Sequence, residues 1–88
     1  MYKDPVMETI VTRTIRSMMA NEGLSYADLC DRLAKQGIKQ SESTLRSKVN
    51  NGTLAATLFI HIMACAEDES IDLSRIMKKH AKLKKHDP

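Results

Sequence analysis

Residues 42–51 hold side chains that can recognise DNA bases from one short helix. Leu45 and Val49 repeat at i, i+4, so a helix would anchor both on one face, and Gly52 predicts its end. The candidate base-reading residues of this helix are Ser43, Thr44, Arg46, Ser47 and Asn50. Arginine can bind guanine through two hydrogen bonds, asparagine can bind adenine in the same way, and serine can bind either base. The segment therefore predicts a helix that enters the major groove, with a plain polar solvent face as the alternative.

A second group of polar and basic residues is expected near the rim of this helix, where DNA phosphates would lie. These candidate phosphate contacts are Tyr26, Lys35, Lys39, Gln40, Lys48, Asn51 and Thr53. The formal net charge is only +3, but positive charge is concentrated in two segments. Segment 32–66 contains Lys and Arg residues with Glu42 as its only acidic residue, and residues 72–88 are rich in lysine. Such concentrations of positive charge are typical of a phosphate-facing surface, although a basic helix can also be simply solvated.

Local start and stop signals place helices before this segment. Asp4 followed by Pro5 predicts the start of a first helix, because aspartate caps helices and proline suits their first position. Gly23 predicts the end of that helix. Ser25 with Asp28 three residues later forms a capping-box-like pair, which predicts the start of a second helix.

Similar signals place the remaining helices. The third helix is expected to begin at Ser41 or Ser43, and Thr53 is expected to cap a fourth helix that runs to about Ala66. Asp72 is expected to cap a last, amphipathic basic helix. The composition, with 42% hydrophobic and 3% aromatic residues and six methionines, suits packed helices better than a sheet.

These signals together predict an all-α fold in a single domain over residues 1–88. We expect a compact bundle of about five helices with a central helix-turn-helix core at residues 24–52. The amphipathic basic helix is expected at residues 72–86.

The central segment also resembles a known family. Residues 23–29 read Gly-Leu-Ser-Tyr-x-x-Leu, and residues 43–52 read Ser-Thr-Leu-x-x-x-Val-x-Asn-Gly. This pattern resembles the Cro/repressor-type helix-turn-helix domain of bacteria and phages, although the connection here is a few residues longer than in that family. The motif from Thr44 to Leu54 is also similar to a small uncharacterised bacterial domain family. The resemblance implies sequence-specific binding of double-stranded DNA, as by a small bacterial or phage transcriptional regulator.

Other function classes find little support in the residues. We see no carboxylate pair, glycine-rich phosphate loop or nucleophile–base arrangement, so we expect no enzyme, no catalytic residue, no cofactor and no small-molecule substrate. Cys30 and Cys65 lack zinc-ligand spacing and are expected to be reduced core residues of a cytoplasmic protein, with no metal site. No apolar run approaches a membrane span. The main alternative to DNA binding is an adaptor that uses this fold to bind another protein.

A homodimer is also expected, because one short reading helix touches few base pairs and a two-fold pair of helices would read more. The candidate dimer residues are Leu73, Ile76, Met77 and Leu83 in the last helix, with Val6 and Ile10 in the first helix as the second choice. The alternative for the last helix is docking within its own chain.

Overall fold

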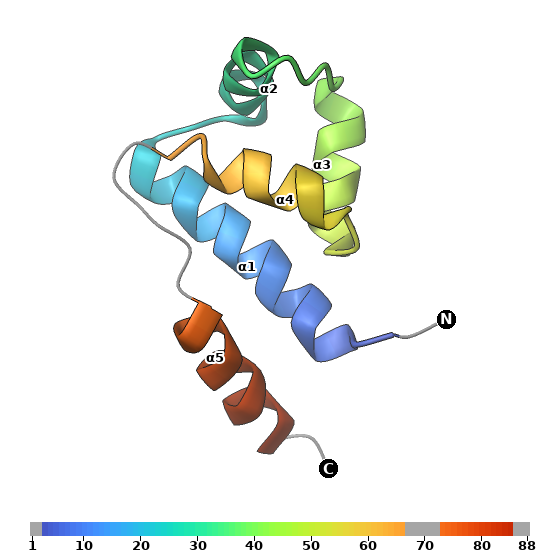
Figure 1. Cartoon of the computed structure of the whole chain (residues 1–88), viewed down its shortest axis with the longest axis vertical. Helices are drawn as coiled ribbons and strands as arrows, with labels where there is room; N and C mark the ends of the chain where they lie inside the picture. The colour runs from blue at the N-terminus through green and yellow to red at the C-terminus, as the bar shows by residue number, and fades with distance from the viewer. Residues whose placement is uncertain (1–2, 67–72, 86–88) are drawn as a thin grey trace.

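The computed structural model describes residues 3–66 and 73–85, which form five α-helices and contain no strand (Figure 1). The helices are α1 (Pro5–Glu22), α2 (Tyr26–Lys35), α3 (Glu42–Asn51), α4 (Ala56–Met63) and α5 (Leu73–Lys85). The all-α class expected from the composition and the helix signals is therefore confirmed.

The first three helices begin at the capping residues that the sequence indicated. The Oδ1 atom of Asp4 accepts a hydrogen bond from the backbone N–H of Met7 at 3.0 Å, and Pro5 is the first residue of α1. Ser25 and Asp28 form a complete capping box at the start of α2. Of the two candidates for α3, Ser41 is the cap, because its side chain accepts the N–H of Thr44. These starts were predictable because each cap is a local interaction.

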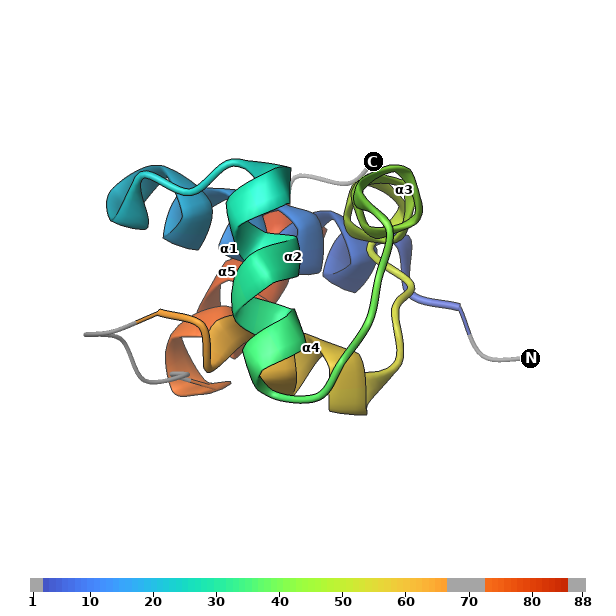
Figure 2. The same ribbon diagram turned by 90° about the horizontal axis from the view of Figure 1, so that it is seen from above.

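Helices α2 and α3 pack against each other and cross at a steep angle. Figure 1 views α2 nearly along its axis and α3 from the side, and the turned view in Figure 2 reverses this. Residues 36–41 connect the two helices, and Gly37 at φ +84° provides the bend that follows α2. The crossing leaves one long side of α3 at the edge of the molecule.

The main hydrophobic core joins the first four helices. It consists of Ile15, Met18, Met19, Leu29, Leu33, Leu45, Val49, Leu58, Ile62, Met63 and Cys65. Aliphatic and methionine side chains fill it, as the near absence of aromatic residues requires. Because α3 contributes only Leu45 and Val49, the rest of that helix is free to carry polar residues.

The last helix packs along α1, on the side away from α2 and α3, as both views show (Figures 1 and 2). His80 Nε2 lies 2.8 Å from the Oδ2 atom of Asp4, so one side chain caps α1 and holds α5. Ile76, one turn before His80, is partly buried, whereas Met77 is 53% exposed. In the structure, α5 therefore docks against α1 of its own chain, which is the alternative to a dimer interface that we considered for this helix.

Two expectations need correction. The fourth helix does not begin at Thr53: α4 starts at Ala56, and the capping position Ala55 makes no side-chain hydrogen bond. The chain needs the residues after Gly52 to turn from α3 towards the core. Ile10 is also not an apolar surface residue, because it is only 2% exposed in a helix that packs against α3, α4 and α5. The expected cap Asp72 lies outside the described residues.

A close backbone approach between α3 and α1 gives the first prediction. Gly52 ends α3 at φ +64°, and a Cβ added there would lie 2.0 Å from the carbonyl oxygen of Glu8. Gly52→Ala should therefore lower the free energy of unfolding by the cost of a left-handed alanine, about 1–2 kcal/mol, and by a further 1–3 kcal/mol, roughly, for the clash. Urea denaturation measures the total loss in the free energy of unfolding.

The matched control is Gly23→Ala, since Gly23 ends α1 at nearly the same φ, +67°, with nothing within 4 Å of its added Cβ. The control should show only the backbone cost. Equal losses for the two variants would contradict the close approach of α3 to α1.

Candidate nucleic-acid interface

Helix α3 has one buried side and one exposed side. Leu45 and Val49 are fully buried, and all five candidate base-reading residues, Ser43, Thr44, Arg46, Ser47 and Asn50, are exposed. A shallow hollow of about 350 Å³ runs along Ser43, Arg46, Ser47, Asn50 and Asn51. The structure thus places on one surface most of the residues that the helical spacing grouped together. Their role in reading bases stays a prediction.

Arg46 is held in place by two neighbours. Its guanidinium forms an ion pair with Glu42 one turn earlier at 2.9 Å, and it lies 5.1 Å from the centre of the Tyr26 ring in α2. Both ends of the ion pair are half exposed, so water screens it and the pair contributes at most about 1 kcal/mol. Arg46 is therefore held at a defined place on the surface. Replacing Glu42 by another partner would cost little free energy, because the ion pair is weak.

Thr44 and the two serines differ in their engagement. The hydroxyl of Thr44 accepts a hydrogen bond from the Ser41 hydroxyl at 2.7 Å, which ties Thr44 to the cap of α3. Within the described residues, the side-chain hydroxyls of Ser43 and Ser47 make no hydrogen bond. The serine hydroxyls are thus the more available of the small polar groups on this face.

Helix α1 fixes the end of α3. The buried hydroxyl of Thr12 donates a hydrogen bond to the backbone carbonyl of Val49 at 2.6 Å. Next to it, the guanidinium of Arg16 donates to the side-chain carbonyl of Asn50. This second bond orients the Asn50 amide and places a cation directly beside the proposed reading face.

Sequence reasoning missed the contribution of α1 to this surface. Thr9, Arg13 and Arg16 line a groove of about 380 Å³ between α1 and the end of α3, together with Asn50 and other residues. Both arginines are exposed. Their spacing at i, i+4 and i+7 would have shown a shared helix face. The sequence could not show that this face lies beside α3.

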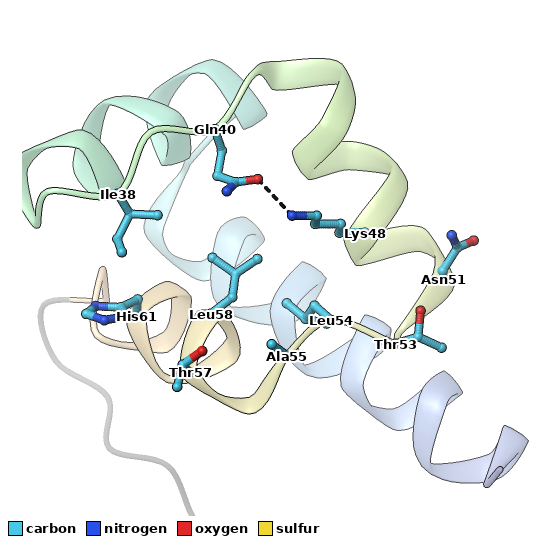
Figure 3. A pocket seen from close by; sticks show the side chains of 10 residues that line it. All are labelled: Ile38, Gln40, Lys48, Asn51, Thr53, Leu54, Ala55, Thr57, Leu58 and His61. Atoms are coloured by element: carbon cyan, nitrogen blue, oxygen red, sulfur yellow. Dashed lines mark hydrogen bonds between the residues drawn. The ribbon is translucent and has the colours of Figure 1, made fainter. Parts of the chain in front are cut away.

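The candidate phosphate contacts do not form one group. Lys35, Lys39, Asn51 and Thr53 are exposed, and Tyr26 lies under Arg46. Lys48 is different: it is partly buried, on the other flank of α3 from Arg46, and its ammonium group donates to the side-chain carbonyl of Gln40 at 3.2 Å (Figure 3). Lys48 and Gln40 therefore face a separate pocket beside α4, which Asn51 and Thr53 also line.

The dimer candidates divide in a similar way. Ile10 is buried, Val6 and Ile76 are partly buried, and Met77 is exposed. The side chains of Leu73 and Leu83 lie outside the described part of the chain. Homodimer formation stays a prediction, and the described surface leaves Met77 as its most exposed candidate.

The basic residues of α5 lie away from the α3 face. Lys78, Lys79 and Lys82 are exposed on a helix that packs along the opposite side of α1 (Figure 1). The described lysines of α5 and the basic residues beside α3 therefore lie on different sides of α1. This separation allows their contributions to be tested independently.

The cysteines are packed thiols. Burial raises the pKa of Cys65, only partly opposed by Arg32 and Gln36, and burial together with nearby Glu42 and Asp31 raises the pKa of Cys30. Both thiols are free. A raised pKa keeps a thiol protonated at neutral pH and makes it a poor nucleophile.

The described residues contain neither a metal-ligand cluster nor a membrane-spanning helix. Residues 3–66 and 73–85 contain no group of three or more His, Cys, Asp or Glu side chains that could hold a metal ion. None of the helices in this part of the chain is both long enough and apolar enough to cross a membrane.

Comparison with known proteins adds one family. A family model described as a domain of unknown function, DUF6471, matches residues 7–71. The chain belongs to the DUF6471 family. The match includes all of α2, α3 and α4, so the α3 face lies inside the DUF6471 domain, and it ends before α5. No curated protein and no solved structure matches the chain.

The bond from Thr12 to Val49 gives the second prediction. Thr12→Val keeps the shape of the side chain but removes the buried donor, so it should lower the free energy of unfolding by about 1 kcal/mol. Thr9→Val is the matched control, because the Thr9 hydroxyl is exposed and bonds only within its own helix, to Pro5, and should cost less than about 0.5 kcal/mol. Chemical denaturation of both variants decides whether α1 fixes the end of α3 in this way.

Proposed function

We propose that this protein binds double-stranded DNA by placing α3 in the major groove, and that it acts as a small transcriptional regulator. The supporting observation is the exposed side of α3, on which Arg46, Ser47 and Asn50 lie above the buried anchors Leu45 and Val49. These side-chain types are the ones that bind guanine and adenine edges in the major groove.

The dimensions of α3 support this proposal. The helix has 10 residues and is therefore about 15 Å long, and a groove about 12 Å wide admits an α-helix. The helix lies at the edge of the molecule, where α2 and α4 do not cover its outer side (Figure 1). The exposed Arg13 and Arg16 of α1 lie beside it, where they could neutralise phosphates of the flanking backbone.

The same surface favours DNA over a protein partner. Energetically important residues of protein interfaces are mainly large aromatic side chains and arginines in apolar, desolvated patches. The exposed large hydrophobic residues in the described part of the chain are Ile60 and Met77, and neither belongs to α3. A protein adaptor that used α3 would therefore have Arg46 as the only arginine or large aromatic side chain on that helix.

The third prediction tests base reading. The triple variant Arg46→Ala, Ser47→Ala, Asn50→Ala should fold normally, because all three side chains are exposed. It should lose roughly 1–3 kcal/mol of discrimination for each bidentate base contact removed. Duplexes selected from a random pool, followed by affinity measurements on the best and a scrambled site, provide the readout.

Arg46→Lys is the matched control for charge. Lysine keeps the positive charge but lacks the planar fork, so affinity for the scrambled site should persist while preference for the best site falls. A triple variant that prefers its best site as strongly as the wild type would exclude α3 as the reading helix.

The fourth prediction separates the two basic surfaces. Arg13→Gln with Arg16→Gln should weaken binding to every duplex and reduce the slope of log affinity against log salt by about 1–2, because each lost phosphate contact removes about 0.9. Lys78→Gln with Lys82→Gln changes the net charge equally on α5 and should alter the slope by less than about 0.5. Equal effects of the two pairs would contradict the proposed orientation, and absence of duplex binding by the wild type at low salt would favour the adaptor.

A further inference from the structure

The second flank of α3 borders a pocket that the DNA proposal does not use. It has a volume of about 510 Å³ and lies between the 36–41 connection, the second half of α3 and residues 53–61, which include most of α4 (Figure 3). Ile38, Leu54 and Leu58 give it an apolar floor, and Gln40, Lys48 and His61 are among its polar lining residues. Volumes of this size are typical of sites that bind small molecules.

Lys48 gives the pocket its charge. Its ammonium group bonds to a neutral acceptor, the Gln40 side chain at 3.2 Å, and none of the residues that line the pocket is acidic. Figure 3 shows this pair above the side chains of Leu54 and Leu58. A partly buried cation without a carboxylate partner next to an apolar floor favours an anion that carries an apolar group.

His61 has a fixed place at the edge of this pocket. Its Nδ1 atom is 2.7 Å from the side-chain carbonyl of Gln36, and the amide nitrogen of Gln36 donates to the backbone carbonyl of His61. These two contacts join α4 to the residue that ends α2. The wall of the pocket formed by α4 is therefore held in position before any ligand enters.

We propose that this pocket binds a small aliphatic monocarboxylate, with the carboxylate on Lys48 and the hydrocarbon group on Ile38, Leu54 and Leu58. One cation matches one negative charge, whereas a dianion would leave a charge without a partner beside the apolar floor. An inorganic phosphate would gain nothing from the three aliphatic side chains.

The pocket also connects a ligand to the orientation of α3. One wall belongs to the connection and another to α3 itself, so a ligand that touches both restrains the end of the connection against the helix. The ligand site does not depend on DNA binding, but any effect of the ligand on DNA binding through α3 rests on the proposed function. Binding is therefore tested without DNA, so that failure of one proposal is distinguishable from failure of the other.

The test titrates isotope-labelled protein with isovalerate and follows backbone and methyl NMR signals. Isovaleramide has nearly the same shape without the charge, and inorganic phosphate has charge without the apolar group. We expect saturable shifts at Ile38, Lys48, Leu54 and Leu58 with isovalerate below about 10 mM, a range suited to weak ligands, and at least tenfold weaker binding of both comparison compounds.

Variants locate the charge contact. Lys48→Met keeps an unbranched side chain and should weaken isovalerate binding at least tenfold, whereas Lys39→Met, an exposed lysine of the connection that does not line the pocket, should leave it within twofold. The comparison of isovalerate with isovaleramide uses the wild-type protein, so it still tests the proposal if a variant fails to fold. Shifts that never saturate, equal binding of isovaleramide or phosphate, or equal losses in the two variants would each overturn the proposal.

Discussion

The contact between α1 and the end of α3 governs the rest of this structure. Gly52 brings the backbone of α3 against the carbonyl of Glu8, in a space that no Cβ could enter, and the Thr12 hydroxyl bonds to the Val49 carbonyl beside it. Leu45 and Val49 of the same helix are fully buried in the core. The direction of α3, and hence the side that it exposes, follows from this junction at its C-terminal end.

This junction explains how the fold tolerates its long connection. In a tight helix-turn-helix, the turn itself sets the angle between the two helices. Here residues 36–41 leave α2 through Gly37, and the position of α3 is determined by its buried residues and by α1. The connection can therefore be longer without displacing α3. Ile38 and Gln40 of this connection form a wall of the pocket.

Features that depend on neighbouring residues were predictable from the sequence, and features that depend on distant packing were not. The caps at Asp4, Ser25 and Ser41 and the buried stripe of α3 are local, and each lies where the sequence indicated, with Ser43 discarded as the alternative cap. The exposure of Ile10 was predicted wrongly because nothing in the spacing of α1 shows which of its sides other helices cover. Arg13 and Arg16 were missed for the same reason, since only the fold brings them beside Asn50.

The polar side chains on the two flanks of α3 are held in different ways. Arg46 forms a half-exposed ion pair with Glu42, and Asn50 accepts a hydrogen bond from Arg16, both on a surface open to solvent, where exchange of these partners for DNA would cost little. Lys48 lies on the opposite flank, partly buried and directed at Gln40, so a DNA phosphate would have to draw it out of its pocket. None of the residues that line this pocket is acidic, so Lys48 has no carboxylate beside it there. The position of Lys48 therefore suits the proposed carboxylate ligand, which would enter the pocket from solvent and leave the Arg46 side of α3 exposed.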